Sequence, residues 1–127
     1  MNTLTQEKAR AIRATTPPAA VRMMPDRVGA IARQGDCVIR RIEGPITKQA
    51  EGIALLADGA HGAHVALGPL AWSADGILRV GEGGIVVIVH TDQPDARHTA
   101  IGLHPGNHVI TGMRERTSAG FVVRVQD

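Results

Sequence analysis

Residues 77–115 read ILRVGEGGIVVIVHTDQPDARHTAIGLHPGNHVITGMRE, and the run of five β-branched residues at 85–89 (IVVIV) decides the fold. Gly83 and Gly84 precede this run, and a polar loop containing Pro94 follows it. A short unbroken apolar run between turn residues is typical of a strand buried on both faces. The stretch therefore predicts the central strand of a β-sheet.

The rest of the chain alternates short apolar runs with turn signals. Fifteen glycines and seven prolines divide it into short elements, and a core must be built mainly from Val, Ile, Leu and Ala because there is one Trp, one Phe and no Tyr. The spacing predicts an all-β, single-domain barrel or sandwich of about eight short strands. The further strands expected lie at 27–32, 37–43, 52–57, 63–68, 70–72, 77–80, 98–103, 108–115 and 121–126. Pro69 is expected to end the strand at 63–68.

An extended N-terminal arm at residues 1–26 is expected to precede the β-domain at 27–127. Thr3 and Gln6 have the spacing of a capping box, which indicates a short helix at 3–14. The segment after it is rich in proline and is expected to lie on another surface. The arm residues expected to bind a partner are Arg10, Arg13, Pro17, Pro18, Val21, Arg22, Met23 and Met24.

Charge is distributed unevenly along the chain. Residues 1–42 hold eight Lys or Arg and three Asp or Glu, whereas the remainder holds six basic and nine acidic residues. A basic leading segment suits a negatively charged partner, nucleic acid included, and a solvated basic face is the alternative. Exposed aromatic rings, which base stacking requires, are scarce at 2% of the sequence.

The chain has one cysteine, Cys37, so an internal disulfide is excluded. The N-terminus carries no apolar leader, and no run approaches the roughly 20 apolar residues that a membrane helix needs. These features predict a soluble protein made in a reducing, intracellular compartment, with no membrane partner. No Gly-x-Ser-x-Gly motif or phosphate-binding loop is present, which favours a role without catalysis while leaving enzyme activity open.

Histidines offer the best candidate for a binding site. A metal site of the cupin type draws imidazoles from neighbouring strands and a carboxylate from nearby. The spacing argues against such a site, because His61 and His64 would face opposite sides of a strand and Pro105 lies between His104 and His108. We therefore expect no cofactor, with a divalent metal as the alternative. The candidate oxygen ligands would be Asp92, Asp95 and Glu115.

Three segments resemble a family of small, functionally uncharacterised β-proteins of bacteria and phages over residues 33–127. The chain has R-Q-G-D-C-V at 33–38, G-A-H at 62–64, and H-T-A-I-G-L-H-P-G at 98–106, followed by R-E at 114–115. The family segments read R-Q-G-D-V, G-H-A-H and H-x-P-I-x-L-P-P-G-x-Y-x-V-x-R-Q-R-E. The resemblance implies that, if the family's histidines bind a metal, His64 and His98 are the ligands here. His61, His104 and His108 do not fall on family histidines and are weaker candidates.

Taken together, the sequence favours an assembly protein whose arm contacts neighbouring subunits. A phage capsid decoration or cement protein would combine a compact β-domain with such an arm, and its partner would be a capsid shell or a second copy of the chain within a virion. The alternatives are a cupin-like metal-binding protein or metalloenzyme, and a nucleic-acid-associated protein using the basic segment.

Overall fold

The computed structural model describes residues 21–59, 62–90, 99–112, 114–116 and 122–124. Every regular element in that part of the chain is a strand, so the all-β prediction is confirmed. None of its elements is a helix of the length and hydropathy that crossing a membrane requires. The helix expected at 3–14 lies outside the described residues. The strands are β1 (Val21–Met23), β2 (Ile31–Gln34), β3 (Cys37–Ile42), β4 (Glu51–Gly59), β5 (Gly62–Trp72), β6 (Ile77–Val80), β7 (Val86–His90), β8 (Ala100–Leu103), β9 (Gly106–Thr111), β10 (Arg114–Arg116) and β11 (Val122–Arg124).

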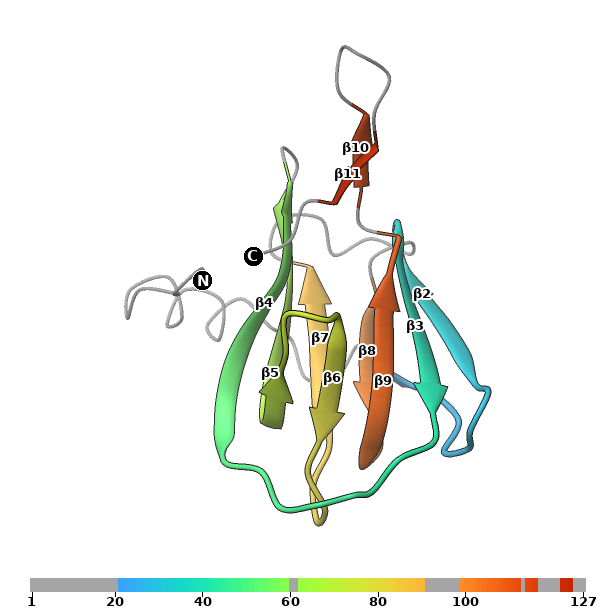
Figure 1. Cartoon of the computed structure of the whole chain (residues 1–127), viewed down its shortest axis with the longest axis vertical. Helices are drawn as coiled ribbons and strands as arrows, with labels where there is room; N and C mark the ends of the chain where they lie inside the picture. The colour runs from blue at the N-terminus through green and yellow to red at the C-terminus, as the bar shows by residue number, and fades with distance from the viewer. Residues whose placement is uncertain (1–20, 60–61, 91–98, 113, 117–121, 125–127) are drawn as a thin grey trace.

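Nine of these strands form one sheet that curls into a half-barrel (Figure 1). The order is β1-β8-β7-β5-β6-β9-β3-β2, with β4 added on the other side of β5, and β10 and β11 form a separate hairpin. The described pairs are antiparallel except β1 with β8, which are parallel. The path of strands is therefore open between β1 and β2, which are edge strands, and β4 is a further edge because it pairs only with β5.

Strand β5 turns the corner of the half-barrel. Its first part pairs with β4 and β7, and Leu70–Trp72 pairs with β6. Gly68 lies at the corner with φ +138°, and a Cβ there would lie 2.5 Å from the carbonyl oxygen of Ile85. The prediction that Pro69 ends a strand is wrong, because β5 continues through it. Proline has no N–H to donate, but the Pro69 carbonyl still accepts a hydrogen bond from Gly81 N at 2.8 Å.

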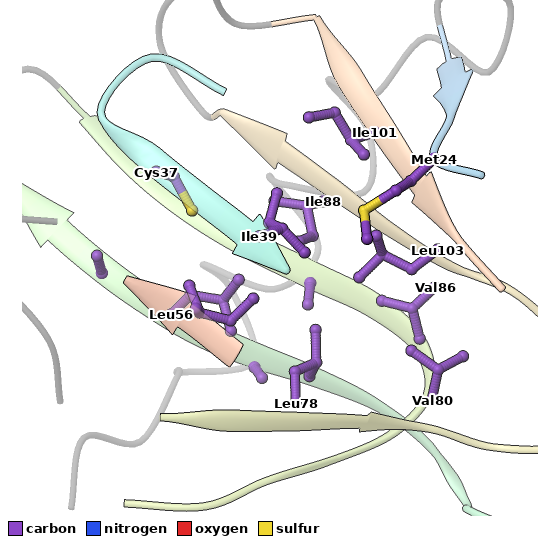
Figure 2. Close-up of a cluster of buried hydrophobic side chains, with 14 of the residues drawn as sticks. Met24, Cys37, Ile39, Leu56, Leu78, Val80, Val86, Ile88, Ile101 and Leu103 are labelled. Carbon is purple, nitrogen blue, oxygen red and sulfur yellow. The ribbon is translucent and has the colours of Figure 1, made fainter. Parts of the chain in front are cut away.

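Strand β7 contains four of the five β-branched residues that decided the sequence argument. Val86 and Ile88 lie in the main cluster inside the half-barrel (Figure 2). Val89 belongs to a second cluster on the opposite face, against which Val87 packs. The prediction of a central strand buried on both faces is confirmed for this run, whose neighbours are β5 and β8. Ile85 precedes the strand and is 43% exposed.

The last residues of the predicted arm belong to the domain. Val21–Met23 form β1 beside β8, and the Met24 N–H donates to the carbonyl of Gly102 at 2.9 Å. The Met24 side chain is buried in the main cluster (Figure 2). The described domain thus includes residues from 21 onward, before the boundary at 26/27 that the sequence predicted.

Candidate functional site

A buried glutamine and a buried histidine meet inside the half-barrel. Gln34 is the last residue of β2, His64 lies near the start of β5, and both side chains are almost fully enclosed. The His64 Nδ1 and the Gln34 Oε1 are 2.7 Å apart. The Gln34 amide nitrogen donates to the Ile88 carbonyl at 2.8 Å and to the Thr99 carbonyl at 3.0 Å. Residues far apart in the sequence therefore join one polar network.

This network determines the tautomer of His64. Both N–H groups of the Gln34 amide point at carbonyl oxygens, so the amide oxygen must face the imidazole. That oxygen can only accept, and His64 must therefore donate from a protonated Nδ1. In the neutral ring the lone pair then lies on Nε2. A histidine whose Nδ1–H is held by an oxygen acceptor is the arrangement that proteins use to orient metal-binding imidazoles.

His90 lies directly opposite His64 in the β5–β7 pair. Their ring centroids are 4.8 Å apart and the ring planes are nearly perpendicular. An imidazole nitrogen binds zinc at about 2.0–2.1 Å, which puts its ring centroid about 3.2 Å from the metal and two such centroids about 5 Å apart at a tetrahedral angle. This separation suits two ligands of one ion, and it is also the ordinary spacing of side chains directly opposite each other in an antiparallel pair.

His90 was not among the metal candidates predicted from the sequence. A signal was available, because residues 86, 88 and 90 share one face of a strand and the first two are inside the half-barrel. The missing information was the register between β5 and β7, which no local pattern fixes. His61 and His98, the other candidates near these strands in the sequence, lie outside the described residues. Within the described part, no group of three or more His, Cys, Asp or Glu residues is placed to share an ion.

His104 and His108 lie in another part of the half-barrel. His108 is on β9, which pairs with β3 and β6, whereas His64 is on the part of β5 that pairs with β4 and β7. Burial, and then the positive charge of Arg41, lower the pKa of His108 to about 4. Cationic Arg41 disfavours a second cation beside His108. The structure therefore does not bring these two histidines together with His64, although the sequence offered all three as candidates.

The single cysteine is part of the core. Cys37 begins β3 and is the register partner of Gln34. Its side chain is fully buried in the main apolar cluster (Figure 2). A thiol enclosed by apolar side chains is a poor nucleophile, because burial disfavours the thiolate.

The predicted partner-binding residues fall into three groups. Arg22 and Met23 are exposed on the edge strand β1, and Val21 is half-buried against the second apolar cluster. Met24 is enclosed in the main cluster and does not present a surface. The remaining arm candidates, Arg10, Arg13, Pro17 and Pro18, lie outside the described residues. The described end of the arm is therefore part surface and part core.

The basic residues of the leading segment also differ in their surroundings. Arg33 on β2 and Arg40 on β3 are exposed, and their strand positions place both on the outer face of the hairpin. Arg41 lies on the inner face and forms an ion pair with Asp26, with Nη1 and Oδ1 2.7 Å apart.

Comparison with known proteins adds no assignment: no family model, no curated protein and no solved structure matches this chain.

Proposed function

We propose that this protein binds a divalent transition-metal ion through His64 and His90. The observation that carries the proposal is the hydrogen bond from His64 Nδ1 to Gln34 Oε1, which fixes the tautomer and the orientation of a buried ring. His90 supplies a second imidazole at a separation that suits a shared ion. Gln34 and His64 also come from two of the three segments on which the family resemblance rests.

The chemistry of the pair limits the metal. Neutral imidazole suits zinc, nickel, copper and iron, whereas calcium and magnesium prefer oxygen ligands. Two imidazoles fill part of a coordination shell, so water or a small ligand would occupy the other positions. The proposal is therefore a metal-binding function, and the open positions are where a substrate would bind if the protein is a metalloenzyme.

Titration of metal-free protein with Zn²⁺ in a calorimeter, and with Co²⁺ followed by visible absorption, tests the proposal. One ion should bind per chain, and His64→Ala and His90→Ala should each weaken binding by at least about tenfold. His104→Ala is the matched control, because it removes an imidazole from the β8–β9 connection and should leave affinity unchanged. Equal binding by the wild type and both site variants would refute the assignment.

A second candidate is the assembly role, in which residues 1–20 join one copy of the chain to another. The observation that favours it is the exposure of three apolar side chains after the arm: Met23, Val28 and Ile31 are 40%, 53% and 59% exposed. These residues lie on the open edge strands β1 and β2 and the segment between them. Open edges and exposed apolar side chains are both common at association surfaces.

The structure sharpens the test of the assembly role. Deleting residues 1–26 would remove β1 and Met24 from the sheet and core, so the deletion should stop at residue 20. Light scattering after size exclusion should show an oligomer for the full chain, and a smaller species for both the 1–20 deletion and the Ile31→Ser variant. A monomeric full chain would exclude self-assembly and leave a capsid shell as the partner to test by co-sedimentation.

A further inference from the structure

We infer that Gln34 couples metal binding at the histidine pair to closure of the half-barrel. The inference rests on the proposed metal function and adds a consequence for the whole fold. It makes Gln34 a positioning residue, which holds both the imidazole and the sheet edge without touching the ion.

Gln34 connects the edge strand β2 to β7 and to the residue before β8. Its backbone belongs to β2, and β3 is the strand with which β2 pairs. Its amide nitrogen, however, donates to the carbonyls of Ile88 on β7 and of Thr99, which directly precedes β8. The Gln34 side chain thus connects β2, at one edge of the curled sheet, to β7 and the start of β8, which are distant from β2 in the strand order.

The same amide group holds His64. Because an amide is planar, its oxygen and nitrogen have a fixed relative direction, and rotating the group away would break all three hydrogen bonds together. An ion bound at Nε2 requires the proton on Nδ1, and the Gln34 oxygen accepts that proton. Metal binding therefore favours the orientation of Gln34 that also ties β2 to β7 and residue 99.

Coupling of this kind acts in both directions. Bound metal should reduce opening of β2 from β7, and a weakened tie at β2 should reduce affinity for the metal. Outer hydrogen-bond partners of metal-binding histidines contribute about 10–100-fold to affinity when they are removed. The position of Gln34 on β2 is important because β2 is an edge strand, and edge strands open more readily than central strands.

Hydrogen exchange of the full-length chain, measured by mass spectrometry with and without Zn²⁺, tests the coupling. In the wild type, zinc should slow exchange at least about threefold in peptides covering 31–34 and 86–90, and should leave peptides from β10 unchanged. Gln34→Met, which keeps the size and removes all three hydrogen bonds, should bind Zn²⁺ about 10–100-fold more weakly.

Gln34→Glu separates the two roles of the amide. A carboxylate can still accept from His64 Nδ1 but cannot donate to the Ile88 and Thr99 carbonyls. At saturating Zn²⁺ this variant should bind the ion and show no added protection of residues 31–34. If wild-type protein binds zinc without slower exchange at 31–34, the coupling is refuted and the metal function stands. If it binds no zinc, the proposed function fails and the coupling with it.

Discussion

Arg41 lies directly opposite His108 across the β3–β9 pair, so a guanidinium and an imidazole share the inner face of the half-barrel. Asp26 pairs with Arg41, and the Arg41 side chain is only 11% exposed. His108 is 1% exposed, and its Nδ1 has no hydrogen-bond partner among the described residues. Burial and the neighbouring charge together lower the pKa of His108 to about 4. His108 is therefore neutral at pH 7.

We predict that His108 makes the protein less stable in mild acid. At a pH between the unfolded-state pKa of about 6.5 and the folded-state pKa of about 4, the His108 imidazole is protonated in the unfolded chain but neutral in the folded chain. The free energy of unfolding should therefore fall as pH drops through this window, by up to about 3 kcal/mol. Urea denaturation followed by the fluorescence of Trp72, the single tryptophan, measures it at pH 7, 5.5 and 4.5.

His108→Leu should flatten the stability profile between pH 6.5 and 4. Titration of Asp26 does not contribute to the change in stability in this pH window. A hydrogen bond from Arg41 lowers the pKa of Asp26 below 3.8, so the stability that this carboxylate contributes is lost only at more acidic pH. An unchanged slope in His108→Leu would show that other groups cause the acid sensitivity.

Gly68 and Gly83 provide a matched pair for the corner of β5. Both have positive φ, +138° and +83°, so alanine is strained at either position by about 1 kcal/mol. A Cβ at Gly83 meets nothing within 4 Å, but one at Gly68 meets the Ile85 carbonyl oxygen at 2.5 Å and the Val86 Cα at 3.1 Å. Gly68→Ala should therefore cost about 1–3 kcal/mol more than Gly83→Ala. Equal losses in thermal or urea unfolding would show that the backbone at the corner relaxes freely.

Local patterns were enough to predict most of the strands, although not β1, which the sequence placed in the arm, and they did not predict the arrangement of the strands. Residues 85–89 indicated β7 because β-branched residues between glycines and a polar loop have few other structures available. Pro69 misled because proline usually ends a strand, whereas here a glycine directly before it lets β5 bend and change partners. Local sequence does not encode which distant strands pair with one another, because that pairing depends on the curvature of the whole sheet.

The candidate site shows the same limit. His64 was identified as a candidate from one segment of the family resemblance, whereas Gln34 was quoted only as a letter of another segment. Its role depends on an approach to Ile88 and Thr99 across 54 and 65 residues of sequence. His90 required the register of β5 with β7. A site assembled across the opening of a sheet leaves little local signal, because each residue is ordinary in its own segment.

Two adjacent methionines test where the domain begins. Met24 is 3% exposed in the main cluster, whereas Met23 is 40% exposed on β1. Met24→Ala should lower the free energy of unfolding by about 2–5 kcal/mol, because it leaves a cavity among Leu, Ile and Val side chains. Met23→Ala should cost less than about 1 kcal/mol, since the side chain is largely in water. If both variants unfold like the wild type, residues 21–24 are not part of the core, and the domain begins after residue 26 as the sequence alone predicted.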